Sequence, residues 1–129
     1  MHMVDNSSLN ELSYIVRGCI YEVYNTLGPG LLESIYESAL MLELQEHGLR
    51  SARQVPLAVE YKGHELGEGL RLDIVVEDSI IIELKSVEAL QPVHHKQLLT
   101  YMKLAQIHLG FLVNFNTSDI NGSIKRKVL

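Results

Sequence analysis

Residues 71–85 read RLDIVVEDSIIIELK, and this stretch decides the fold. Val, Ile and Leu dominate both of its halves, as is typical of buried β-strands, and a polar triplet at 77–79 separates them. A three-residue hairpin loop at the triplet sets the register, because strand residues then pair in order outward from the loop. We therefore expect two adjacent antiparallel strands in which Asp73 lies directly opposite Glu83.

Two carboxylates and a lysine share one face of this expected hairpin. Directly opposed side chains have Cβ atoms roughly 4.5–5.5 Å apart, and like charges at that spacing repel unless something neutralises them. A divalent cation would do so, and Mg²⁺ suits Asp73 and Glu83 because it is a hard ion that prefers oxygen ligands and keeps several waters. Lys85 points to the same face as Glu83, where its ammonium could orient such a water and offset charge on a phosphate.

Spacing alone leaves a second interpretation open for these three residues. Acidic and basic residues alternate with apolar ones on many exposed strands. Asp73, Glu83 and Lys85 would then form an ion pair on a solvated strand face.

Upstream of the hairpin, apolar residues follow helical spacing. They recur at steps of three and four from residue 9 to residue 27, and the Gly-Pro-Gly at 28–30 then ends the helix. A second helix is predicted over about 31–47. Cys19 lies on the apolar face of the first helix, so we expect a buried core thiol rather than a nucleophile. This single cysteine allows no intramolecular disulfide, which favours a reducing cytoplasm.

The remaining elements complete a mixed pattern. Alternating apolar residues at 53–59 predict a first strand, and Pro56 favours the edge of the sheet because proline donates no ladder hydrogen bond. Helical spacing at 93–106 and an almost wholly apolar run at 109–115 predict a helix and a buried strand. We expect the tail at 116–129 to be a solvated end, with phosphate contact by its basic residues as the alternative.

The order of helix, helix, three strands, helix and strand predicts an α/β fold with helices packed on a four-stranded mixed sheet. The helix before the last strand implies a crossover, so the last strand pairing is expected to be parallel. We expect residues 1–129 to form one domain, since a chain of 129 residues that is 47% hydrophobic can bury one sizeable core.

The charge balance limits how the chain can meet its partners. Eleven basic and 16 acidic residues give a net charge of −5, which is the wrong sign for coating nucleic acid or anionic membrane by bulk charge. A phosphate-bearing partner must therefore be held locally. We see no signal peptide and no membrane span, and we expect no membrane contact.

Residues 30–36, GLLESIY, match the GxxExxY signature of a family of small bacterial and archaeal proteins. Residues 72–73 (LD) and 83–85 (ELK) resemble the core motif of the PD-(D/E)XK nuclease superfamily, to which that family is assigned. The resemblance runs from about residue 9 to residue 127 and implies the superfamily's α-β-β-β-α-β core. Leucine stands at position 72, where the superfamily name has proline.

This resemblance implies that Asp73 and Glu83 bind metal and that Lys85 is the catalytic lysine. It also implies a third metal-binding carboxylate, Glu33 on the second helix. A simpler interpretation of Glu33 is that a carboxylate in the first turn of a helix is stabilised by the helix dipole.

The resemblance also assigns a role to two residues of the third helix. Gln97 and Tyr101, spaced i and i+4, are similar to the QxxxY motif of the exonuclease-like branch, whose side chains line the site. They could equally belong to a polar helix face. The expected catalytic residues are then Asp73, Glu83, Lys85, Gln97 and Tyr101.

Two functions from different classes follow. The first is a metal-dependent nuclease that uses Mg²⁺ or Mn²⁺ to hydrolyse phosphodiester bonds in DNA or RNA. The second is a catalytically silent nuclease-fold binding module or complex subunit, which the acidic charge balance favours because nucleic-acid affinity depends on neutralising phosphates. A protein partner could supply targeting, and the chain would act as a monomer or a homodimer.

Overall fold

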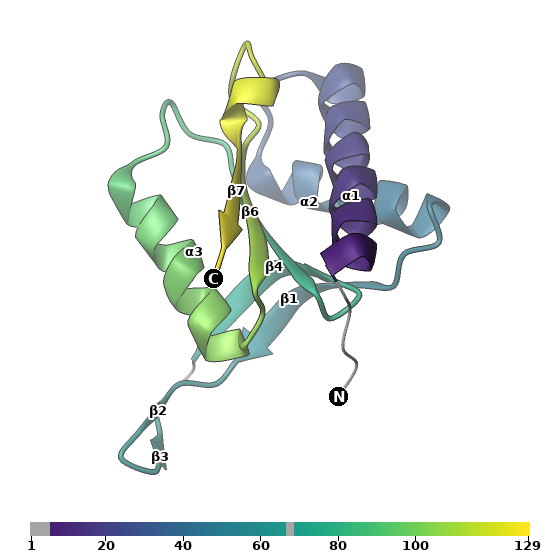
Figure 1. Ribbon diagram of the computed structural model, residues 1–129. Coiled ribbons are helices and arrows are strands. Elements are labelled where there is room, and N and C mark those ends of the chain that lie inside the picture. Colours follow the sequence, from purple (N-terminus) through teal and green to yellow (C-terminus); the bar gives the residue numbers. More distant parts are fainter. Residues whose placement is uncertain (1–5, 67–68) are drawn as a thin grey trace.

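A mixed five-stranded sheet forms the centre of the computed structural model, which describes residues 6–66 and 69–129. Along the chain the elements are α1 (Asn6–Leu27), α2 (Glu33–Glu46), β1 (Ser51–Leu57), β2 (Glu60–Tyr61), β3 (His64–Glu65), β4 (Leu70–Val76), β5 (Ile80–Lys85), α3 (Pro92–Ala105), β6 (Leu109–Asn114), the 3₁₀ helix η1 (Asn121–Ser123) and β7 (Ile124–Val128). The strand order is β1-β4-β5-β6-β7. α1 and α2 lie on one side of this sheet and α3 lies on the other (Figure 1).

The central hairpin has the predicted register. Val76 pairs with Ile80, and the antiparallel ladder between β4 and β5 continues to Ile74 and Ile82. The last pairing through a helix is parallel, as expected, because β5 runs alongside β6 after the α3 crossover. β1 is an edge strand, as the proline predicts. Pro56 has no N–H to donate, and an edge strand tolerates this because it has a neighbour on one side only. The predicted α/β fold class is therefore confirmed.

The number of strands was predicted wrongly, because the sheet has five strands rather than four. The tail expected to be a solvated end instead forms η1 and β7, and β7 pairs antiparallel with β6. Only Ile124 of this strand is buried, while Lys125 and Arg126 are exposed. Charged residues are common on edge strands, where they discourage pairing with other chains, and here they concealed the strand signal.

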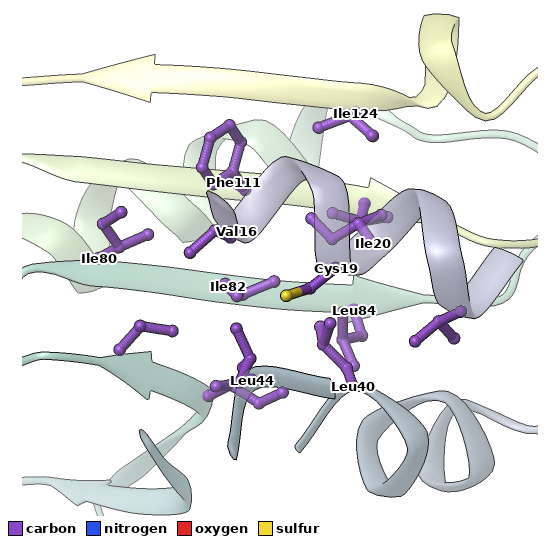
Figure 2. Close-up of a cluster of buried hydrophobic side chains, with 14 of the residues drawn as sticks. Val16, Cys19, Ile20, Leu40, Leu44, Ile80, Ile82, Leu84, Phe111 and Ile124 are labelled. Carbon is purple, nitrogen blue, oxygen red and sulfur yellow. The ribbon is translucent and has the colours of Figure 1, made fainter. Parts of the chain in front are cut away.

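Two apolar clusters cover the two faces of the sheet. Figure 2 shows the larger cluster, between the sheet and helices α1 and α2, where Ile80, Ile82 and Leu84 of β5 meet Val16 and Leu40. The residue between the first two, Ile81, points the opposite way and packs under α3. This alternation is what a strand buried on both faces requires.

Cys19 lies within the larger cluster and is fully buried, as predicted (Figure 2). Burial, together with the nearby charge of Glu43, raises the pKa of its thiol to about 11. The thiol is therefore protonated at neutral pH and acts as a core residue. Among the helices of the described ranges, none combines the length and apolar character that crossing a membrane requires.

Gly110 of β6 lies where side chains of α3 pack tightly on the sheet. A Cβ atom at this position would lie 2.8 Å from Sδ of Met102 and 3.2 Å from Cδ1 of Leu98. We predict that Gly110→Val lowers the free energy of unfolding by about 1–3 kcal/mol, because both buried side chains must move. Urea unfolding measures this change.

A matched control separates this effect from glycine replacement in general. Gly18 is exposed in α1 and a Cβ atom there meets nothing within 4 Å. Gly18→Ala should raise stability by about 0.5–1 kcal/mol, since alanine loses less backbone freedom in a helix. Unchanged stability of Gly110→Val would contradict the close packing of α3.

Candidate functional site

Asp73 and Glu83 lie where strands β4 and β5 begin to separate. The backbone ladder ends at Ile74 and Ile82, and the next residues along the two strands are these two carboxylates. The N–H of Asp73 donates to Oε1 of Glu83 at 3.1 Å, and the N–H of Leu84 donates to Oδ2 of Asp73 at 2.8 Å. Side-chain oxygens thus replace the carbonyls that would have continued the ladder, and each carboxylate is held by the backbone of the opposite strand.

The pKa values of both carboxyls are raised. Burial is the largest cause for Glu83, which is only 7% exposed, and the charge of Asp73 adds to it, so that its pKa rises to about 8. Burial also raises the pKa of Asp73, against the opposing effect of the Leu84 N–H. With a pKa of about 8, the Glu83 carboxyl is largely protonated at neutral pH, and the two carboxyls titrate as a pair. A cation placed there would substitute for this proton.

Lys85 and Tyr101 approach the pair from two different elements. Lys85 is the last residue of β5, and its ammonium lowers the pKa of both carboxyls, which places its charge within electrostatic reach of them. Tyr101 belongs to α3, and its pKa is raised first by burial and then by the charges of Glu83 and Asp73. Four of the residues singled out from sequence therefore share one neighbourhood.

Gln97 lies one turn before Tyr101 on α3 and is exposed. Within the part of the chain that the structure describes, its side chain makes no hydrogen bond or ion pair. Its amide is therefore available to a ligand beside Tyr101.

Glu33 begins α2, and its position depends on the motif around it. The Tyr36 hydroxyl donates to the carbonyl of Gly28 at 2.6 Å and accepts the N–H of Leu31 at 3.1 Å, so it ties the loop before α2 to the helix. The Tyr36 ring stacks on Phe115 with centroids 4.3 Å apart. With this turn anchored, Oε2 of Glu33 accepts the N–H of Ser86, just beyond β5, at 3.4 Å.

A pocket of about 120 Å³ joins Glu33 to Asp73. Its other lining residues are Ser34, Glu37, Gln54 and Leu84. Glu37 and Gln54 were not singled out from the sequence, although Glu37 follows Glu33 by four residues and so lies on the same helix face. No pattern in the sequence signals Gln54.

The donor chemistry of this region suits a hard divalent cation. Mg²⁺ is usually held by one or two carboxylates and completes its shell with water, and Asp73 and Glu83 offer two neighbouring carboxyl groups. The pocket itself is lined by the carboxylates of Glu33 and Asp73, together with that of Glu37. Over residues 6–66 and 69–129, no group of three or more acidic, histidine or cysteine side chains is placed so that it could hold a metal ion. The residues therefore fit an open site with few protein ligands.

The raised pKa of Glu83 predicts how stability depends on pH. The folded pKa of about 8 lies above the ordinary 4.5, so the folded protein keeps a proton that the unfolded chain releases. This contribution is complete below pH 4.5 and is lost as pH rises through 8. The metal-free protein should therefore unfold more easily at pH 8.5 than at pH 6.5, as measured by urea unfolding.

Glu83→Gln is the control, because glutamine has the same shape and does not titrate. Its stability should change less over this pH range and should exceed that of the wild type at pH 8.5. If both proteins showed the same pH dependence, Glu83 would have an ordinary pKa.

Comparison with known proteins agrees with this geometry. The profile of the PD-(D/E)XK nuclease superfamily matches residues 10–127, which include most of α1, all of α2 and α3, the whole central hairpin and most of β7. No match was found among curated proteins, and none among solved structures. The match covers far more than half of the 129 residues, and the chain belongs to the PD-(D/E)XK nuclease superfamily.

Proposed function

We propose that this protein is a metal-dependent nuclease that hydrolyses phosphodiester bonds in DNA or RNA. The observation that carries the proposal is the pair formed by Asp73 and Glu83, in which each carboxylate accepts a backbone N–H from the opposite strand. Membership of a nuclease superfamily supports it. We also infer that the chain belongs to the GxxExxY group, because Gly30, Glu33 and Tyr36 supply the signature.

Asp73 and Glu83 would hold the cation, with Glu33 as a third ligand from α2. Mg²⁺ or Mn²⁺ supplies Lewis acidity toward a phosphate oxygen and lowers the pKa of an attacking water. The backbone bonds fix both carboxylates before any ligand arrives. Such preorganisation avoids rearrangement during the reaction.

Lys85 would orient the attacking water and stabilise the charge that develops on the phosphate. Its backbone is fixed because it pairs with Asn114 in the parallel ladder between β5 and β6. An ammonium beside the scissile phosphate would act electrostatically without forming a covalent intermediate. Gln97 and Tyr101 would contact substrate from α3, on the side where Tyr101 already meets the charge of Glu83.

The charge of the chain shapes the partners that we propose. With a net charge of −5, affinity for nucleic acid must come from contacts near the site. A protein partner that adds phosphate contacts would suit this balance, and we propose a cytoplasmic location in keeping with the buried thiol of Cys19. We also propose that residues 1–129 form one domain, acting as a monomer or homodimer, since the helices pack on one sheet.

Lys85→Ala tests the catalytic assignment. With Mg²⁺ or Mn²⁺ and a panel of end-labelled and circular DNA and RNA, we expect wild type to cleave and the variant to be slower by about 10²–10³-fold, because transition-state charge is left uncompensated. Lys103→Ala, at an exposed position in the last turn of α3, should cleave like wild type. Wild-type rates for Lys85→Ala would refute the role of this lysine.

Asp73→Ala tests the cation site separately. The variant should weaken Mn²⁺ binding by more than about 10-fold and abolish cleavage, whereas Lys85→Ala should keep Mn²⁺ binding. Titration calorimetry on the folded proteins measures both affinities. Metal binding by a wild type that cleaves none of the substrates would favour the silent binding module, and a wild type that binds no metal would refute the metal-dependent nuclease.

A further inference from the structure

One residue of β1 has a backbone conformation that strands rarely contain. Gln54 lies in the middle of Ser51–Leu57 with φ of 50°, in the left-handed region where residues other than glycine are strained. Strain of this kind amounts to about 1–3 kcal/mol and persists only where surrounding contacts enforce it. Contacts elsewhere in the fold must therefore hold Gln54 in this conformation.

Gln54 of β1 lies opposite Asp73 of β4 in the register of the two strands. The ladder between β1 and β4 pairs Arg53 with Ile74 and Val55 with Leu72. The position between these two pairs is occupied by Gln54 on β1 and Asp73 on β4, and the ladder omits both. The strained residue thus lies directly opposite a proposed metal ligand.

In both strands, the alternation of side chains between the two faces of the sheet breaks at Gln54 and Asp73. In a regular strand, residues two apart lie on the same face. On β1, however, Arg53 contacts α2 whereas Val55 packs under α3, and on β4 Ile74 belongs to the cluster under α1 and α2 whereas Leu72 belongs to that under α3. The alternation therefore breaks in both strands where Gln54 faces Asp73.

Contacts from α2 and β4 hold Gln54 in this conformation. Its Nε2 donates to Oε1 of Glu37 at 2.6 Å, and its carbonyl accepts Nη1 of Arg71 at 3.3 Å. Oε2 of Glu37 accepts Nη2 of Arg53 at 2.8 Å and Nε at 3.2 Å. Glu37 is only 6% exposed, so it is a buried carboxylate with both oxygens occupied by β1.

We infer that Gln54 is a positioning residue for Asp73, and that Glu37 holds Gln54 in place. The inference rests on the proposed function, in which Asp73 is a metal ligand. A left-handed Gln54 releases Asp73 from the β1 ladder, and the carboxylate of Asp73 then reaches the N–H of Leu84 on β5. Glu37 shares the pocket with Asp73, yet both of its oxygens are bound to β1, so its part is to hold the strand and not the cation.

Two substitutions of Gln54 separate backbone conformation from side-chain chemistry. Gln54→Gly removes the amide but adopts positive φ without strain, whereas Gln54→Val strongly disfavours it because valine is β-branched. If the backbone turn positions Asp73, Gln54→Gly should keep the Mn²⁺ dissociation constant within about threefold of wild type, and Gln54→Val should weaken binding at least tenfold. Gln54→Ala, which also disfavours positive φ, replaces valine if that variant does not fold.

A measurement without metal distinguishes failure of this inference from failure of the proposed function. Hydrogen exchange of the Leu84 amide, followed by NMR on the metal-free full chain, reports its bond to Asp73. Exchange should accelerate at least tenfold in Gln54→Val and stay near wild type in Gln54→Gly. A wild type that binds no Mn²⁺ would overturn the proposed function, and the exchange rates would still decide whether Gln54 positions Asp73.

Glu37→Ala tests whether the hydrogen bonds from Glu37 to Arg53 and Gln54 hold Gln54 in its left-handed conformation. Alone, Glu37→Ala should weaken Mn²⁺ binding. Adding Gln54→Gly should restore the affinity, because glycine adopts positive φ without help from Glu37. Arg50→Ala is the control. Arg50 lies just before β1, and its Nη2 forms an exposed ion pair with Oδ2 of Asp78 at 2.9 Å, so losing this pair should leave the Mn²⁺ affinity unchanged. Equal losses in both Gln54 variants, no loss in either, or no rescue of Glu37→Ala would each overturn the inference.

Discussion

The candidate site depends on one constraint, the separation of β4 and β5 beyond Ile74 and Ile82. Where the ladder ends, the buried carboxyl of Glu83 and the half-buried carboxylate of Asp73 accept hydrogen bonds from backbone N–H groups of the opposite strand. Buried backbone N–H groups need acceptors, so the strands can separate here only because Asp73 and Glu83 supply them. The same bonds that close the sheet also aim the carboxylates, and structure and proposed chemistry are therefore inseparable at this point.

The burial of these carboxyls lowers the stability of the metal-free protein when they are ionised. Burying two adjacent carboxyls raises the pKa of each, so one proton is retained near neutral pH. A group that folds more readily when protonated gives up stability as pH rises. Functional sites commonly hold such unfavourable charge, because the ligand that compensates for it is then bound selectively.

Helix α2 contributes to the site by two different means. Its first turn brings Glu33 to the pocket, and Tyr36 anchors that turn through Gly28 and the ring of Phe115. One turn further on, Glu37 is bound to β1 and shapes the strand opposite Asp73. Two carboxylates four residues apart on one helix thus differ in role because their partners differ.

The local pattern of the chain predicts most of the fold and the centre of the site. The apolar halves of residues 71–85 and the short loop between them determine the hairpin register, and with it the meeting of Asp73 and Glu83. The helices and the parallel crossover follow from apolar spacing and element order. Such features depend on residues close in sequence, whose side chains alternate with a fixed period.

Tertiary contacts alone decided the remainder. The fifth strand is charged along most of its length and is held by pairing with β6, so its own residues do not predict it. The left-handed Gln54 is enforced by Glu37 and Arg71, each 17 residues away in the chain. Since a strained conformation exists only where distant contacts compensate for it, sequence alone determines that two carboxylates meet, and only the folded structure decides how they are aimed.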